Sequence, residues 1–250
     1  MSATLNIKYT LLSSNLDFTV NLVFDKEDFS LQRPEPGGKD WTRLAFYKCS
    51  HCPLDEKDFQ FCPLAGAIDS VISPLHSLLS YDEVHARVEY QNRTVSADIT
   101  VQRALSSLLG LIIPASGCPH TRYLRPMSRY HQPFADTEET IYRATTMFLM
   151  AQYFIHRKSG CIPTDFSRLG IIYNNLHIVN TQICNRLRVF CENDSPLNAI
   201  TILDMLTMSM QSALKHDLDK FAPYFSAFSE NLLLPQERQQ IPGGAADENN

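Results

Sequence analysis

Four cysteines in the first half of the sequence have the residue type and spacing of a metal site. Cys49 and Cys52 form a Cys-x-x-Cys motif, nine residues separate Cys52 from Cys62, and 55 residues separate Cys62 from Cys118. A tight Cys-x-x-Cys motif lets two thiolates meet one metal from a single turn, and the other ligands then come from elsewhere in the fold. We therefore predict that Cys49, Cys52, Cys62 and Cys118 hold one metal centre.

The residues next to these cysteines bear on which metal would bind. Proline follows Cys52, Cys62 and Cys118, and Cys-Pro occurs in ferredoxin motifs, where proline stiffens the ligand loop. This favours an iron–sulfur cluster over Zn²⁺. Because imidazole is also a zinc ligand, His51 or His120 could replace a cysteine in a zinc site.

Two other interpretations of the cysteines stay open. Cys49 and Cys52 could form a redox dithiol, although the acidic loop after Pro53 does not favour a thiolate. Alternatively, the thiols are inert, because cysteine is often a small buried hydrophobe. We expect this inert role for the cysteines that stand singly in the second half of the sequence, Cys161, Cys184 and Cys191.

A basic segment follows Cys118. Residues 119–133 contain Arg122, Arg125 and Arg129 and no acidic residue. Such a stretch could bind phosphate, a nucleotide or an acidic protein surface. In the alternative, its arginines form ordinary surface ion pairs with carboxylates such as those of Glu138, Glu139 or Asp82.

The composition is that of an ordinary globular protein. Apolar residues make up 44% and charged residues 20%, and the net charge is −5. This balance does not call for nucleic acid or an anionic membrane as a partner. No apolar run approaches the ~18 residues of a membrane span. The amino terminus resembles no signal peptide, and Ser2 does not fit the myristoylation motif. Seven cysteines, an odd number, fit reduced thiols in the cytoplasm better than a secreted disulfide scaffold.

Periodicity predicts an α+β fold, with a small antiparallel sheet and helices followed by an antiparallel α-helical region. We expect one part over 1–117, a helical part over 118–234 packed with it, and a disordered tail over 235–250. Alternating apolar residues predict strands at 5–12, 16–24, 29–32, 84–90 and 94–101. Helical spacing predicts helices at 64–75, 102–113, 136–157, 165–191, 195–215 and 217–228, with Pro114 ending the second of these.

Several stretches resemble an uncharacterised bacterial family over most of residues 5–230. They are Ser116-Gly117-Cys118-Pro119-His120-Thr121, the segment 142–147, the segment 151–154, the Cys49–Cys62 segment and residues 79–84. The resemblance implies a bacterial, cytoplasmic origin and no particular activity.

Three functional hypotheses follow from these residues. In the first, a metal-dependent protein has a binding or regulatory role, and its partner is another protein. In the second, an enzyme acts on an anionic small molecule between the thiols and the Arg122–His131 segment. In the third, the chain is a metal-free structural interaction module. There is no Gly-rich phosphate loop and no Gly-x-Ser-x-Gly motif in the sequence, so kinase and hydrolase readings have no support.

Overall fold

The structure is a computed structural model that describes residues 3–32, 38–75, 78–160, 165–191, 194–216 and 218–231. The chain forms two compact units, Met1–Gln211 and Ser212–Asn250. The disordered tail predicted over 235–250 lies outside the described residues. None of the described helices is long and apolar enough to cross a membrane.

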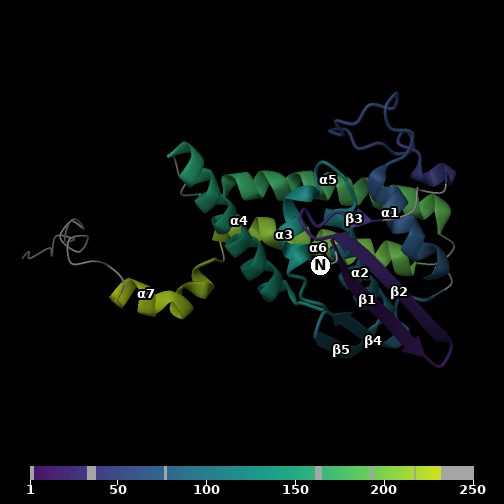
Figure 1. Ribbon diagram of the computed structural model, residues 1–250, viewed down its shortest axis with the longest axis horizontal. Helices are drawn as coiled ribbons and strands as arrows, with labels where there is room; N and C mark the ends of the chain where they lie inside the picture. Colours follow the sequence, from purple (N-terminus) through teal and green to yellow (C-terminus); the bar gives the residue numbers. More distant parts are fainter. Residues whose placement is uncertain are drawn as a thin grey trace, which may run out of the picture. The chain divides into compact units, whose positions relative to one another are not determined.

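The first unit contains a five-stranded antiparallel sheet with the strand order β3-β2-β1-β4-β5 (Figure 1). Alternate side chains of the central strand β1, from Leu5 to Leu11, are buried. One face of the sheet therefore faces a core and the other faces solvent. The strands are β1 (Thr4–Ser13), β2 (Leu16–Asp25), β3 (Leu31–Gln32), β4 (Glu83–Tyr90) and β5 (Arg93–Thr100).

The predicted α+β class is confirmed, and the predicted hairpins are the β1–β2 and β4–β5 pairs. The helices are α1 (Pro63–Ile72), α2 (Val101–Ala115), α3 (Arg125–Arg129), α4 (Thr137–Ser159), α5 (Ser167–Phe190), α6 (Ser195–His216) and α7 (Ser226–Asn231). Short 3₁₀ turns are η1 (Asp40–Thr42), η2 (Ser73–Leu75), η3 (Arg122–Leu124) and η4 (Leu218–Phe225).

One hydrophobic core joins the sheet to α1, α2, α5 and α6. Tyr9 of β1, Ile68 of α1 and Leu108 of α2 have no exposed surface. Val179 and Ile183 of α5 belong to the same cluster. Residues on both sides of position 117, where we drew the boundary between the two parts, thus contribute to this core.

The prediction that Pro114 ends its helix is wrong, because α2 continues through Pro114 to Ala115. A proline inside a helix leaves the carbonyl four residues earlier without its amide donor. For Pro114 that carbonyl belongs to Gly110, and the hydroxyl of Ser128 donates to it over 3.4 Å. A donor from α3 therefore replaces the missing helical hydrogen bond.

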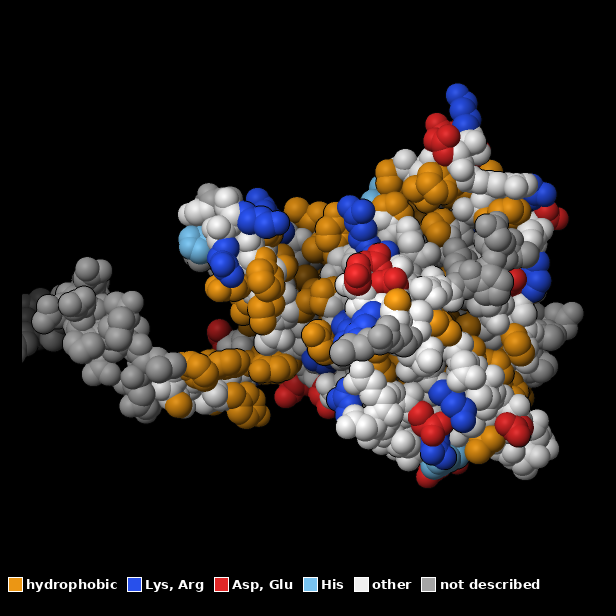
Figure 2. All heavy atoms as spheres, viewed as in Figure 1, with side chains coloured by type: hydrophobic (Ala, Val, Ile, Leu, Met, Phe, Trp, Pro, Cys, Tyr) orange, Lys and Arg blue, Asp and Glu red, His pale blue; other side chains and the backbone are white. Residues whose placement is uncertain are grey.

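Helix α4 begins with a capping box, because Asp136 accepts from the amide of Glu139 and Glu139 accepts from the amide of Asp136. From the sequence, the predicted inner stripe of this helix is Ile141, Ala144, Phe148, Ala151 and Ile155. It is wrong in its second half, where Ala151 and Ile155 are exposed and Gln152 is buried instead. A stripe that continues at 3.6-residue spacing from Phe148 reaches position 152 rather than 151. Apolar side chains consequently cover the surface of this half of α4 (Figure 2).

Candidate functional site

The four cysteines that we predicted to be metal ligands line one small pocket, together with the predicted ligand His120. The cavity has a volume of about 20 Å³, and Arg186 of α5 also lines it. Cys118 is buried, and Cys49, Cys52 and Cys62 are half-buried. The fold thus brings together thiols from three separate segments. Every cysteine in the described part of the chain is a free thiol.

A turn and a helix start position the first three thiols. The amide of Cys52 donates to the carbonyl of Cys49 over 3.0 Å, which closes the turn of the Cys-x-x-Cys motif. Cys62 is the N-cap of α1, with Pro63 in the first helical position. Its amide donates to the carbonyl of Thr42 over 2.8 Å, which ties α1 to η1.

The loop after α2 positions Cys118. Gly117, with a φ of +95°, turns the chain, and the Cys118 amide donates to the hydroxyl of Ser116 over 3.3 Å. Burial raises the pKa of the Cys118 thiol. The main-chain amides of His120 and Thr121 donate to this sulfur and oppose that rise.

The conformation of Gly117 gives a first stability prediction. An alanine Cβ at this position would lie 3.5 Å from Cβ of Pro63, an ordinary contact, so the cost of Gly117→Ala is backbone strain. We expect it to lower the free energy of unfolding by about 1–3 kcal/mol, measured by urea denaturation. The control is Gly170→Ala in α5, where a Cβ would meet no described heavy atom within 4 Å. It should raise the stability by about 0.5–1 kcal/mol. Equal effects of the two substitutions would contradict the prediction.

His51 and His120 are stacked beside the thiols, with ring centroids 3.8 Å apart. Nε2 of His120 donates to the carbonyl of His51 over 2.8 Å, and Nε2 of His51 donates to the carbonyl of Asn175 over 3.2 Å. Because a carbonyl only accepts, a neutral ring then keeps an unprotonated Nδ1. Nδ1 of His51 is buried and has no hydrogen-bond partner among the described residues. Burial, followed by the proximity of His120, lowers the pKa of His51.

Arg186 supplies a buried positive charge next to the thiols. The residue is 2% exposed, and its guanidinium donates to the carbonyls of Trp41 and Arg43 over 2.8 Å each and to that of Leu44 over 3.3 Å. No carboxylate of the described residues lies within ion-pair distance of it. Its charge interacts instead with Cys62, Cys49 and Cys52.

The pKa of Cys49 is raised to about 12, mainly by burial and also by the neighbouring Cys62, Cys118 and Cys52, whereas Arg186 opposes the rise. As the side chains stand, no group of three or more His, Cys, Asp or Glu within the described ranges is arranged so that it could hold a metal ion. Metal binding at this pocket would therefore require the thiol side chains to rotate.

Each of the three arginines predicted to bind an anion has a different partner within the chain, and none of them lines the thiol pocket. Arg125 forms an ion pair with Asp28 over 3.0 Å, and Arg122 is exposed over the ring of Tyr123. Arg129 donates to the hydroxyl of Tyr90. The ion-pair partner of Arg125 is thus Asp28, on the loop after β2, rather than one of the three acids that we had named.

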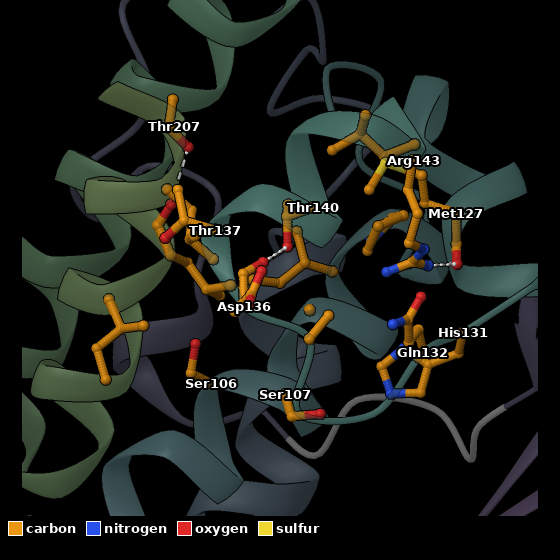
Figure 3. Close-up of a pocket in the computed structure, with 18 of the residues that line it drawn as sticks. Ser106, Ser107, Met127, His131, Gln132, Asp136, Thr137, Thr140, Arg143 and Thr207 are labelled. Carbon is orange, nitrogen blue, oxygen red and sulfur yellow. Dashed lines mark hydrogen bonds between the residues drawn. The ribbon is translucent and has the colours of Figure 1, made fainter. Parts of the chain in front are cut away.

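A second, larger cavity of about 320 Å³ lies between α2, α3, α4, α5 and α6 (Figure 3). Arg143 of α4 and His131 of the preceding loop line it. His131 is the end of the Arg122–His131 segment that we predicted to border an anion site, whereas Arg143 was not singled out from the sequence. Arg186 was missed as well, although the sequence held a signal. Position 186 falls on the apolar stripe of α5, three residues after Ile183, and a charge in such a stripe indicates a buried partner.

The sequence model of a family described as a domain of unknown function (DUF6901) matches residues 7–226. Comparison with curated proteins finds no match. Comparison with solved structures also finds no match.

Proposed function

The chain belongs to this family of unknown function, so we propose from its own residues that it is a zinc-binding protein. In this proposal Cys49, Cys52, Cys62 and Cys118 hold one Zn²⁺, and the metal stabilises the part of the fold that α1, α2 and α5 share. His120 would be the alternative ligand if one thiol stays outside the coordination sphere.

The single observation that supports the proposal most is Arg186 beside the thiols. An isolated buried charge costs several kcal/mol, and buried charges in proteins are therefore paired. The described part of the chain offers Arg186 carbonyl dipoles but no carboxylate within 4 Å. Zn²⁺ with four thiolates has a net negative charge, so it would supply the missing counter-charge.

The size of the pocket supports a single ion over an iron–sulfur cluster. A volume of about 20 Å³ corresponds to about one water-sized sphere, and a cluster with several iron and sulfide atoms needs a wider cage. This reverses the preference for a cluster that the Cys-Pro sequences suggested. An iron–sulfur cluster remains the second candidate, because rotation of the thiol side chains would also change the volume of the cavity.

A closed site with four protein ligands is typical of structural zinc, whereas catalytic zinc keeps an open position for water or substrate. We therefore propose a binding or regulatory role for the protein rather than catalysis at the thiols. The free thiols support a reducing compartment such as the cytoplasm. An enzyme site between the thiols and the Arg122–His131 segment stays a prediction without further support.

Metal analysis of the full chain tests the proposal. We expect one zinc per chain after anaerobic purification, and no visible absorption of an iron–sulfur cluster. Cys62→Ser and Cys118→Ser should weaken zinc binding by more than the about 10- to 100-fold that is typical of outer-shell changes, because each removes a direct ligand. Cys184→Ser is the matched control, since Cys184 is buried but does not line the pocket.

Three outcomes would contradict the proposal. A folded chain that takes up no zinc in a competition titration would favour the metal-free interaction module. A brown protein with several irons per chain would favour the cluster. Equal zinc loss in the Cys184→Ser control would show that the substitutions act through general unfolding.

A further inference from the structure

The larger cavity has the size and lining of a small-molecule site. Its volume of about 320 Å³ is at the lower end of the about 300–1,000 Å³ that ligand pockets occupy. Most of its wall is aliphatic or aromatic, and it includes Ile113, Leu124, Met127, Phe134, Leu176 and Leu206. The ligand must therefore present an apolar body to these side chains.

Two cations line this cavity, Arg103 of α2 and Arg143 of α4, and main-chain carbonyls fix Arg143 in place. Its Nη2 donates to the carbonyls of Met127 over 2.7 Å and Tyr130 over 3.1 Å, at the end of α3. Among the described residues no carboxylate lies within ion-pair distance of it. Burial lowers the pKa of Arg143, and the proximity of Tyr173 and Glu139 opposes that shift. The fork of a guanidinium matches the two oxygens of a carboxylate, and Nε and Nη1 remain for such a ligand.

Asp136 lines the cavity, and its carboxylate, like that of Glu139, is engaged in hydrogen bonds at the start of α4. Asp136 and Glu139 accept each other's amides at the start of α4. Glu139 also accepts from the side-chain amide of Gln132 over 2.6 Å. These carboxylates are therefore held by the helix cap rather than by Arg143.

A neutral donor accompanies Arg143. The hydroxyl of Tyr9, which is completely buried, hydrogen-bonds to Nε2 of His131 and lies 3.0 Å from the hydroxyl of Ser107. Ser107 in turn accepts from the amide of Phe134 over 3.1 Å. If Ser107 donates to Tyr9 and Tyr9 donates to Nε2, every group in the chain is satisfied. The proton of His131 is then on Nδ1.

The charge state of His131 is consistent with this network. Burial, with the proximity of Arg143, lowers the pKa of His131 to about 3. The ring is therefore neutral near pH 7, so Nδ1–H is a donor without adding a second positive charge. Figure 3 shows Arg143 and His131 on the same side of the cavity.

From this arrangement we propose that the cavity binds a small amphipathic carboxylic acid. The carboxylate accepts from the guanidinium of Arg143 and from the neutral ring of His131, and the apolar body lies against Leu124, Leu176 and Leu206. This site is separate from the thiol pocket, since the two cavities share no lining residue, and it does not depend on a bound metal.

Isothermal titration of the full chain with decanoate, decanol and decylamine below their micellar concentrations tests this proposal. We expect saturable binding of one decanoate per chain. Replacing the carboxylate by a hydroxyl should weaken binding about 10- to 100-fold, the equivalent of one or two charge-assisted hydrogen bonds. Decylamine should bind more weakly still, because its charge has the same sign as that of Arg143.

Arg143→Gln should remove most of the difference between decanoate and decanol, while Arg122→Gln, an exposed arginine outside the cavity, leaves it unchanged. Equal binding of the three probes by the wild-type chain, or no binding at all, would overturn the proposal even if Arg143→Gln fails to fold. A loss of decanoate binding in Arg122→Gln alone would move the anion site to the surface segment. Because the titration involves no metal, failure of the zinc proposal would leave its outcome unchanged.

Discussion

Removal of the proposed zinc with a strong chelator should lower the free energy of unfolding by about 4 kcal/mol, relative to protein that holds zinc at 1,000 times its Kd. The effect is large because the ligands come from three segments. In the unfolded chain, 55 residues separate Cys62 from Cys118, and a metal that joins them removes much of the conformational freedom of that loop. Urea denaturation with zinc and with chelator measures the difference.

The Cys62→Ser variant is the control for this experiment, since a chain that binds the metal more weakly should show a smaller difference in stability between the two buffers. A chelator effect of equal size in this variant would mean that the chelator acts elsewhere. No effect in the wild type would exclude a stabilising metal at the thiol pocket.

The pH dependence of stability should have opposite signs with and without metal. Without metal, the folded pKa of Cys49, raised to about 12 from 9.0, makes a contribution that is fully present below about pH 9. It is lost as the pH rises toward 12, where the unfolded thiol ionises more readily. With zinc, the thiolates are the bound form, so acid should release the metal and its stabilisation.

Replacing Arg186 by methionine should lower the free energy of unfolding by about 3–5 kcal/mol, the usual cost of breaking a buried charged network. Methionine keeps much of the volume but leaves the carbonyls of Trp41, Arg43 and Leu44 without their donor. These carbonyls connect η1 and the following segment to α5. Urea denaturation in saturating zinc measures the loss.

Arg188→Met is the matched control, because Arg188 lies on the same helix, is exposed, and contacts Asn185 of its own helix. Its stability should stay within about 0.5 kcal/mol of the wild type. If Arg186→Met were equally harmless, the guanidinium would have no structural role. The counter-charge argument for zinc would then lose its basis.

Local patterns predicted most of the fold. Alternation in β1 and the spacing of Val179, Ile183 and Leu187 in α5 come from side chains that meet one core, so they are visible in the sequence. Helix α3 was missed because Arg125–Arg129 is too short for a hydrophobic period. The prediction that the helix ends at Pro114 failed because the Gly110 carbonyl accepts from Ser128 instead of from an amide at position 114. No local sequence pattern connects Ser128 to this helix.

The candidate sites divide in the same way. The convergence of the thiols could be expected from Cys49 and Cys52, because a Cys-x-x-Cys motif usually needs further ligands. The larger cavity could not be expected from the sequence, since five helices contribute to it. Arg143 is positioned there by hydrogen bonds to carbonyls at the end of α3. Which distant groups meet is a property of packing, and a single sequence does not contain that information explicitly.

The position of Arg186 in the chain has a consequence for synthesis on the ribosome. Translation makes all four pocket cysteines before it makes α5. The carbonyls of Trp41, Arg43 and Leu44 accept from Arg186 of this helix, so they lack that donor until α5 has been made. The nascent segment that holds these cysteines therefore carries uncovered thiols and unsatisfied acceptors until Arg186 has been made. Cellular zinc or a chaperone that shields this segment would act during that interval, before the carboxyl-terminal helices are complete.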